Sequence, residues 1–199
     1  MNTPIRSRLA RALGAVCILV GGLALLAQCR SSSGEKADVG NPHAAWGLVY
    51  EVLQHPRCLN CHPAGDVPLQ GDDSRPHAQL VQRGRDGRGR FAMRCTDCHP
   101  AQNSPDAHGP PGAPGWQLPH PEVPLVFEGL SPGDLCRQLK DPARNGGKKM
   151  AEILHYVAED ELVLWGWDPG VGRTPVPISH AAFVAAMKAW IDAGCGCPQ

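Results

Sequence analysis

The chain has 199 residues, with 19 basic and 19 acidic side chains and a formal net charge of zero at pH 7. Three of the basic side chains and none of the acidic ones precede Cys29, so the chain from Cys29 onward has a formal balance of −3, from 16 basic and 19 acidic side chains. This balance excludes the strongly basic surface that nucleic-acid binding requires, and nine cysteines direct attention to disulfides and metal chemistry.

Residues 1–28 have the pattern of a secretory signal sequence, because three arginines precede an apolar run over residues 12–27. The run is short for a membrane span of about 20 residues, so it is either removed or kept as an uncleaved anchor. The run Leu-Ala-Gln-Cys that ends at Cys29 resembles a lipobox, in which the cysteine is lipidated, although Gln28 replaces the usual small residue. We expect a periplasmic protein, either free or anchored through lipidated Cys29 or the retained signal.

Residues 29–40 are small and polar, which predicts a flexible tether, and residues 41–199 are expected to form one domain. Asn41 and Pro42 are a typical helix start. Apolar residues then recur at helical spacing from Trp46 to Leu53. A first helix therefore leads toward the first of two motifs.

The pentapeptide Cys-x-x-Cys-His occurs twice in the chain. Its members are Cys58, Cys61 and His62 in the first copy, and Cys95, Cys98 and His99 in the second. This pattern is typical of c-type haem attachment, in which two thiols bind the haem covalently and the histidine is the proximal ligand of the iron. The sequence therefore predicts two covalently bound haem c groups.

Two other readings of the motifs explain less. A zinc site built from two Cys-x-x-Cys pairs has about 15–20 residues between the pairs, whereas 33 residues separate Cys61 from Cys95, and zinc gives no reason for a histidine after both pairs. A thioredoxin-like redox pair would need one motif within a βαβ pattern, which the sequence lacks.

Between the motifs lies a loop rich in arginine and glycine. Its arginines are Arg83, Arg85, Arg88, Arg90 and Arg94. It is either a solvated flexible loop or a set of cations that pair with haem propionates or guide a partner.

Three more helices are expected, with starts near Ser131 and Ser179 and a third over the apolar residues of 150–157. Segments 105–132 and 166–177 are rich in proline and glycine and are expected to be loops. The fold class is thus mainly α, a compact dihaem cytochrome c-like domain with long loops.

After the four motif cysteines, Cys17 of the signal and Cys29 are set aside, Cys136, Cys195 and Cys197 remain. In an oxidising compartment we expect Cys136 to pair with either Cys195 or Cys197.

The second axial ligand of each iron is sought among the other histidines. His77 and His180 both begin a run of the type His-Ala-x-apolar-Val after a helix-start signal, which predicts that each lies on the apolar face of a helix. They are the expected distal ligands, and His155 is the alternative. Met150 and Met187 lie on apolar stripes, where packing in the core is the expected role.

Several further segments resemble small bacterial proteins labelled as isoquinoline 1-oxidoreductase subunits. These are the runs 69–73, 110–116, 139–142, 145–147 and 165–167, together with the arginine-glycine loop. The resemblance implies a cytochrome that serves a molybdenum hydroxylase of the xanthine oxidase type. The chain itself has no molybdopterin-binding or iron–sulfur cysteine pattern.

From these observations we expect a protein that transfers single electrons between a periplasmic oxidoreductase and a respiratory acceptor, rather than a catalyst. The alternative is a dihaem peroxidase-like enzyme with one open haem. Such enzymes resemble this chain in having two motifs, but they are usually much longer.

Overall fold

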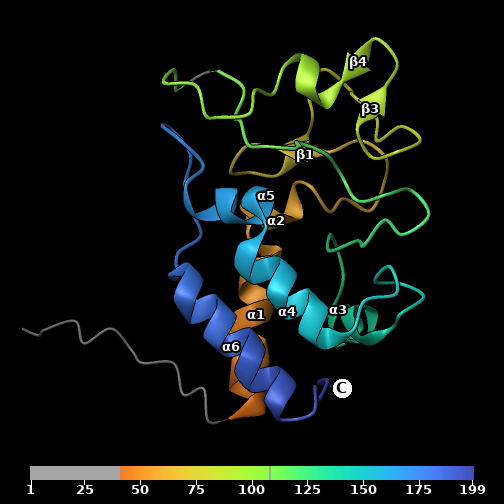
Figure 1. Cartoon of the computed structure of the whole chain (residues 1–199), viewed down its shortest axis with the longest axis vertical. Helices are drawn as coiled ribbons and strands as arrows, with labels where there is room; N and C mark the ends of the chain where they lie inside the picture. Colours follow the sequence, from red (N-terminus) through yellow and green to blue (C-terminus); the bar gives the residue numbers. More distant parts are fainter. Residues whose placement is uncertain (1–40, 108) are drawn as a thin grey trace, which may run out of the picture. The chain divides into compact units, whose positions relative to one another are not determined.

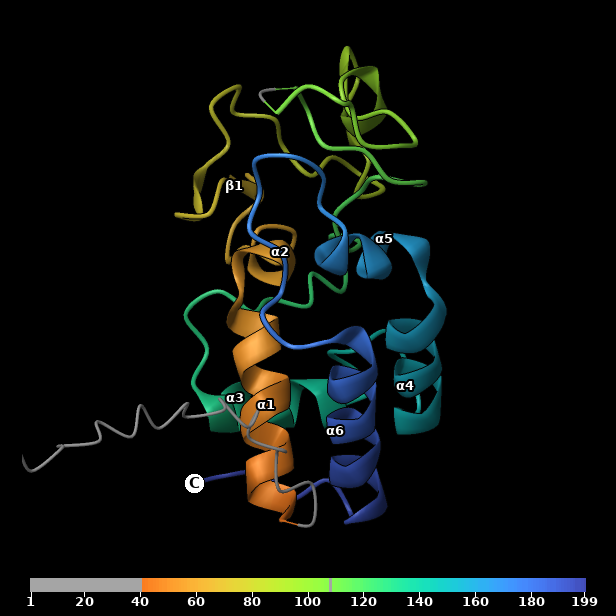
Figure 2. The same ribbon diagram turned by 90° about the vertical axis from the view of Figure 1, so that its left-hand side faces the viewer.

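Helices make up most of the regular secondary structure in the part of the chain that the computed structural model describes, residues 41–107 and 109–199. Those with nine or more residues are α1 (Pro42–Gln54), α3 (Pro132–Lys140), α4 (Met150–Glu159) and α6 (His180–Asp192). Figures 1 and 2 both show α1 and α6 side by side, running in opposite directions, with α4 against α6. The signal, Cys29 and the tether lie outside the described residues.

The caps that the sequence indicated are present at these helices. The side chains of Asn41, Ser131 and Ser179 each accept a hydrogen bond from a backbone N–H in the first turn of α1, α3 and α6, and Pro42 and Pro132 open the first two. Each cap satisfies a donor that would otherwise lack a partner. The mainly helical class and the four expected helices are confirmed.

The apolar faces of these helices form one core. Trp46 of α1 and Trp190 of α6 lie with ring centroids 4.6 Å apart, and both are almost fully buried. The indole of Trp46 donates to the carbonyl of Pro132 at 3.1 Å, which ties α3 to this pair. A disulfide between Cys136 and Cys197 joins α3 to the C-terminal segment, so Cys197 is the partner of Cys136, and Cys195 is a free, buried thiol.

Short elements and loops occupy the other end of this unit (Figure 1). They are α2 (Pro56–Leu59), the antiparallel pair β1 (Leu69–Gln70) and β2 (Arg75–Pro76), the antiparallel pair β3 (Gly89–Arg90) and β4 (Met93–Arg94), the 3-10 helices η1 (Cys95–Asp97) and η2 (Trp165–Trp167), and α5 (Glu161–Leu164). Among the described residues, no helix is long and apolar enough to cross a membrane.

The expected helix at His77 is wrong. His77 follows β2, and its N–H donates to the carbonyl of Pro68 at 2.9 Å, while Leu80 has a φ of 51° and is 65% exposed. A positive φ does not occur within an α-helix, and the N–H of Leu80 bonds to the carbonyl of His77 three residues before it, so residues 77–80 form a turn instead of a helix. The matching run at His180 does begin a helix, α6.

Candidate haem-attachment sites

The first motif lies at a sharp turn after α1. His55 ends α1 and caps α2, and its ring accepts a hydrogen bond from the N–H of Arg57. The N–H of Cys61 then donates to the carbonyl of Cys58 at 3.2 Å, and the N–H of His62 to that of Leu59 at 2.9 Å. One helical turn thus spaces the two thiols and places His62 directly after them.

The ring of His62 is held by two contacts from a distant segment. Its Nδ1 donates to the carbonyl of Leu125 at 2.7 Å, and its face stacks on Phe127 at 3.8 Å between ring centroids, with 10° between the planes. Burial lowers the pKa of His62 to about 4, so the imidazole is neutral at neutral pH. A histidine whose Nδ1–H is bound to a carbonyl presents Nε2 as a metal ligand, the second-shell arrangement usual for metal-binding histidines.

The first motif lines a largely apolar cavity of about 420 Å³. Cys58, Cys61 and His62 contribute one part of its wall, and side chains of α1, α4 and α6 contribute much of the rest, including Leu53, Ile153, Val157, Phe183 and Met187. This volume lies in the range of pockets that hold cofactors, roughly 300–1,000 Å³. The cavity therefore fits a large apolar group attached at the two thiols.

The histidine of the second motif is held by the same two kinds of contact, a hydrogen bond to a carbonyl and stacking on an aromatic ring. Nδ1 of His99 donates to the carbonyl of Pro111 at 2.8 Å, and the ring stacks on Trp116 at 4.4 Å with 4° between the planes. Gly112 lets the segment that carries Pro111 lie against the backbone after the motif, because a Cβ there would lie 2.1 Å from the carbonyl oxygen of Gln102. Burial lowers the pKa of His99, which again favours the neutral ring.

His77 lies opposite this second histidine. The ring centroids of His77 and His99 are 6.3 Å apart, and two imidazoles on opposite sides of one metal ion, each bound at about 2 Å, would have their centroids roughly 6 Å apart. Nδ1 of His77 is buried and has no hydrogen-bond partner among the described residues. Although the helix expected around it is absent, His77 is brought to the second motif.

The other expected distal ligands are placed differently. Nε2 of His180 bonds to the carbonyl of Val157 at 2.9 Å, and its ring packs edge-on against Trp167. His155 is exposed on α4, and neither it nor His180 lines the cavity. Met187, expected to pack in the core, is buried there and also lines the cavity of the first motif.

The four motif thiols are free and buried to different extents. Burial raises the pKa of Cys58 to about 12, which is opposite to the lowered thiol pKa of a redox-active Cys-x-x-Cys pair. Within the described residues, no group of three or more His, Cys, Asp or Glu side chains could hold a metal ion, so the two pairs do not form the tetrahedral set of a zinc site. These features leave the thiols available for covalent attachment.

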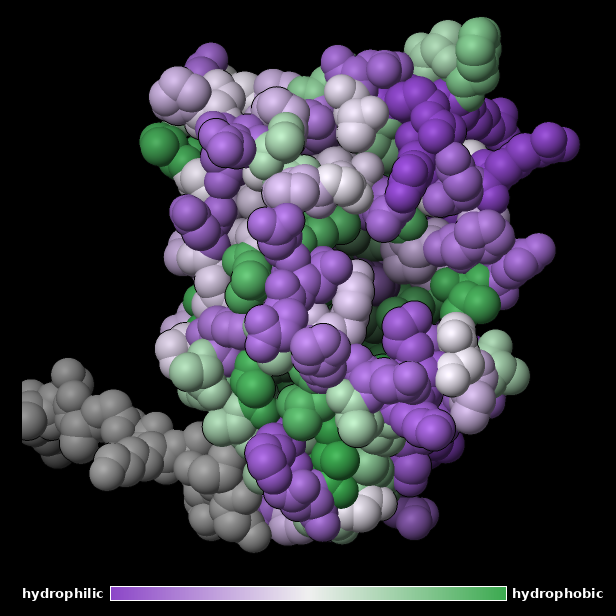
Figure 3. All heavy atoms as spheres, in the orientation of Figure 1, coloured by the Kyte–Doolittle hydropathy of each residue, from purple (hydrophilic) through white to green (hydrophobic). Residues whose placement is uncertain are grey.

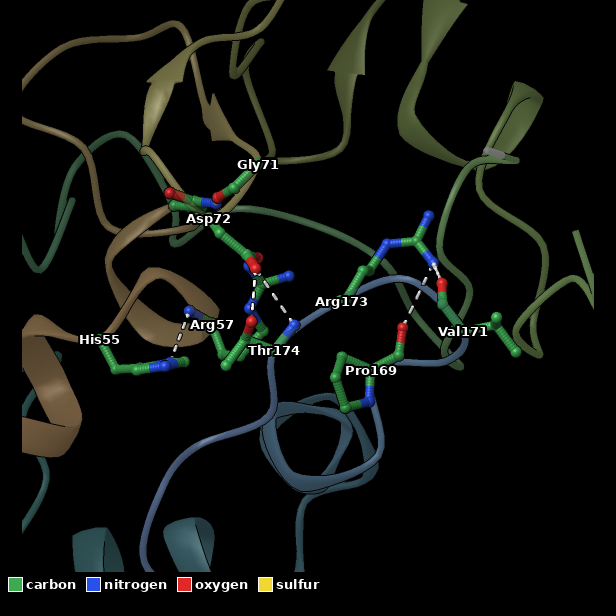
Figure 4. Close-up of polar contacts among 9 residues, drawn as sticks. His55, Arg57, Gly71, Asp72, Pro169, Val171, Arg173 and Thr174 are labelled. Atoms are coloured by element: carbon green, nitrogen blue, oxygen red, sulfur yellow. Dashed lines mark hydrogen bonds and ion pairs between the residues drawn. The ribbon is translucent and has the colours of Figure 1, made fainter. Parts of the chain in front are cut away.

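Arg57, which precedes Cys58 in the sequence, is buried, and the sequence alone did not indicate a role for it at the site. Figure 4 shows Asp72 accepting hydrogen bonds from Arg57 of α2 and from Thr174, which joins three separate segments. Arg57 lines the cavity, and its Nε is buried without a partner in the described structure. A free guanidinium N–H in a cavity wall suits a carboxylate, such as a haem propionate.

One arginine of the arginine-glycine loop is buried and hydrogen-bonded, and the others are more exposed. Arg83 is 1% exposed and bonds to Asp66 and to the carbonyls of Pro119 and Gly65. Its role within the described residues is structural, since it ties three loop segments together. The remaining arginines of the loop lie nearer the surface.

The two motifs are neighbours in space. Trp116, stacked on His99, meets Trp165 edge-on at 5.0 Å between ring centroids, and Trp165 lines the cavity of the first motif. Burial, and after it the nearby thiol of Cys95, raises the pKa of Cys61 to about 11. Groups attached at the two motifs would therefore be close together.

Comparison with protein-family models, with curated proteins and with solved structures finds no match to this chain.

Proposed function

We propose that this chain is an exported dihaem c-type cytochrome that carries single electrons between a periplasmic oxidoreductase and a respiratory acceptor. The proposal depends mainly on one observation: the histidine of each Cys-x-x-Cys-His motif donates its Nδ1–H to a backbone carbonyl, of Leu125 for His62 and of Pro111 for His99. Two histidines that are oriented by the same kind of hydrogen bond, each next to two free thiols, suit two proximal haem ligands.

Each residue of the two sites has a defined part in this proposal. Haem iron, when bound, supplies one-electron chemistry, with a potential set by axial ligands, hydrogen bonds and burial. Cys58 and Cys61 would hold one haem, with His62 proximal, in the apolar cavity. Cys95 and Cys98 would hold the other, with His99 proximal.

His77 is the proposed distal ligand at the second site, supported by its 6.3 Å ring separation from His99. For the first site, His180 remains the predicted ligand and His155 the alternative. The spacing of Trp116 and Trp165 supports electron exchange between the sites, because both aromatic contacts are 5.0 Å or less.

The partner and the location belong to the same proposal. We take the donor to be a periplasmic redox enzyme, with a molybdenum hydroxylase of the xanthine oxidase type as the candidate from the sequence resemblance. Export by the N-terminal signal would place the domain in the periplasm, where covalent attachment of c-type haem takes place, either free or anchored through lipidated Cys29 or the uncleaved signal.

Mass spectrometry of protein matured in a host with the haem-attachment machinery tests the central claim. Two covalent haems per chain are expected, and one after Cys58→Ala and Cys61→Ala are combined. A chain that leaves that host without haem would contradict the proposal. Two haems together with a high-spin iron and turnover of hydrogen peroxide would favour the peroxidase-like alternative instead.

A further inference from the structure

The β3–β4 hairpin presents an apolar side chain that folding does not use. Phe91 at its tip is 98% exposed, and Met93 beside it is 44% exposed. The tip also holds Ala92 at a φ of 65°, a conformation that glycine adopts more easily. An aromatic side chain almost wholly in water adds nothing to the core, and aromatic residues are enriched among those that proteins bury when they bind one another.

Positive charge lies on and just before this hairpin. Arg85, Arg88 and Arg90 are exposed, and among the described residues none of the three forms an ion pair with an acidic side chain. The nearby carboxylate of Asp86 is held by Arg94 at 2.8 Å. Figure 3 shows this corner covered mainly by hydrophilic side chains, with an apolar group at its outer end. The patch is therefore cationic, on a chain whose formal balance from Cys29 onward is −3.

The hairpin is also joined directly to the second motif. β4 runs into η1, which begins at Cys95, and the N–H of Cys95 donates to the carbonyl of Arg88 at 3.1 Å. Cys98, the other thiol of this motif, is exposed. A group attached there would reach the surface next to the patch.

We propose that Phe91, with Arg85, Arg88 and Arg90 on and just before the same hairpin, is part of the docking surface for a one-electron redox protein with an acidic face. The proposal rests on the proposed function, since the partner exchanges its electron with the iron at the second motif. One electron leaves the reduced protein and one is gained by the oxidised protein, so no further reactant is needed. Long-range attraction to the arginines would orient the partner, and Phe91 would be the apolar anchor at the centre of the contact.

An acidic protein is favoured over a lipid surface by the position of the patch. Anchoring to a membrane takes several basic residues with a larger apolar face or a lipid chain, whereas this hairpin and the segment before it have three exposed arginines and one exposed aromatic ring. Its place beside an exposed thiol of the second motif suits electron exchange, which a lipid surface would block.

The test uses the matured dihaem protein with a small acidic blue-copper protein as the probe. Stopped-flow spectroscopy gives the bimolecular rate of electron exchange at several salt concentrations. Titration with both proteins reduced gives the dissociation constant in the absence of electron transfer. The double variant Arg85→Gln/Arg90→Gln should lower the rate at low salt about tenfold and flatten its salt dependence. Phe91→Ser should raise the dissociation constant severalfold at all salt concentrations.

Arg75→Gln is the control, because Arg75 is also an exposed arginine, lies on the other hairpin with 64% of its side chain accessible and pairs with Asp73 at 3.6 Å; it should leave both measurements unchanged. Equal values for the hairpin variants and this control would overturn the proposal. So would hairpin variants whose only defect is weaker binding to vesicles of anionic phospholipid.

Haem mass and visible spectra of the same samples distinguish failure of the proposed function from failure of the docking surface alone. Missing haem contradicts the proposed function, and the docking surface with it, whereas two haems with unchanged docking contradict this inference alone.

Discussion

At the scale of single residues, His62 and His99 depend on carbonyl groups that their own motifs do not contain. Leu125 lies 63 positions after His62 in the sequence, and Pro111 lies 12 after His99. Each carbonyl fixes one ring nitrogen as a donor and leaves the other to act as a ligand. The motif supplies the two thiols and the histidine of each proposed site, and a backbone carbonyl outside the motif orients the histidine ring.

His77 gives the sharpest test at this scale. His77→Ala should leave two covalent haems in place, because the attachment residues are unchanged, and should convert one of the two irons to a high-spin form that binds carbon monoxide. Visible and electron paramagnetic resonance spectra measure this change. His43→Ala is the control, since His43 is exposed at the start of α1 and does not line the cavity, and it should have no effect on either spectrum.

If His77→Ala stayed fully low-spin, the assignment at the second site would be wrong. The same spectra of His180→Ala test its predicted role at the first site. An unchanged spectrum there would leave His180 as a residue that ties α6 to α4 through the carbonyl of Val157.

At the scale of elements, the disulfide and a hydrogen bond join α3 to the C-terminus. Cys136 and Cys197 are 61 positions apart, and a loop of that size limits the unfolded chain by about 4 kcal/mol in the chain-entropy treatment. Replacing both cysteines by serine should lower the free energy of unfolding by about that amount, measured by denaturant titration of the matured protein. Lys140 also bonds to the carbonyl of Cys195 at 2.7 Å and would keep the segment close.

Cys195→Ser is the control for this measurement, because Cys195 is a free thiol and its loss opens no loop. Its effect should be well below that of the double replacement. Equal stability of the double variant and the unchanged protein would show that the C-terminal segment is held by packing alone.

Elements set by local hydrogen bonds could be predicted from the sequence, and those set by contacts between distant segments could not. α1, α3 and α6 were predictable because Asn41, Ser131 and Ser179 cap them through bonds within a few residues. His77 carries a similar local pattern, but residues 77–80 form a turn in which Leu80 has a positive φ. Three features of the sites depend on contacts between distant segments, which no local pattern specifies. They are the position of the His77 ring beside His99, the burial of Arg57 and the wall of the cavity.

At the scale of the whole molecule, the cavity beside the first motif borders the main core. Its wall includes Leu53 of α1, Val157 of α4 and Phe183 of α6, which also belong to the apolar core of the helices. The second motif lies outside that core, among hairpins and loops (Figure 1). Attachment at the two motifs should therefore contribute unequally to stability.

This difference gives a prediction for the folding of the chain. Without the attached group, the cavity of about 420 Å³ would leave apolar side chains of α1, α4 and α6 without packing partners. Loss of a single buried aliphatic side chain already costs about 2–5 kcal/mol, out of a whole stability of about 5–15 kcal/mol for a typical domain. Cys58→Ala/Cys61→Ala should therefore abolish cooperative thermal unfolding, as followed by calorimetry and circular dichroism. Cys95→Ala/Cys98→Ala removes the same number of thiols outside the core and should retain a cooperative transition at a lower temperature. Equal melting of the two variants would contradict the assignment of the cavity to the first motif.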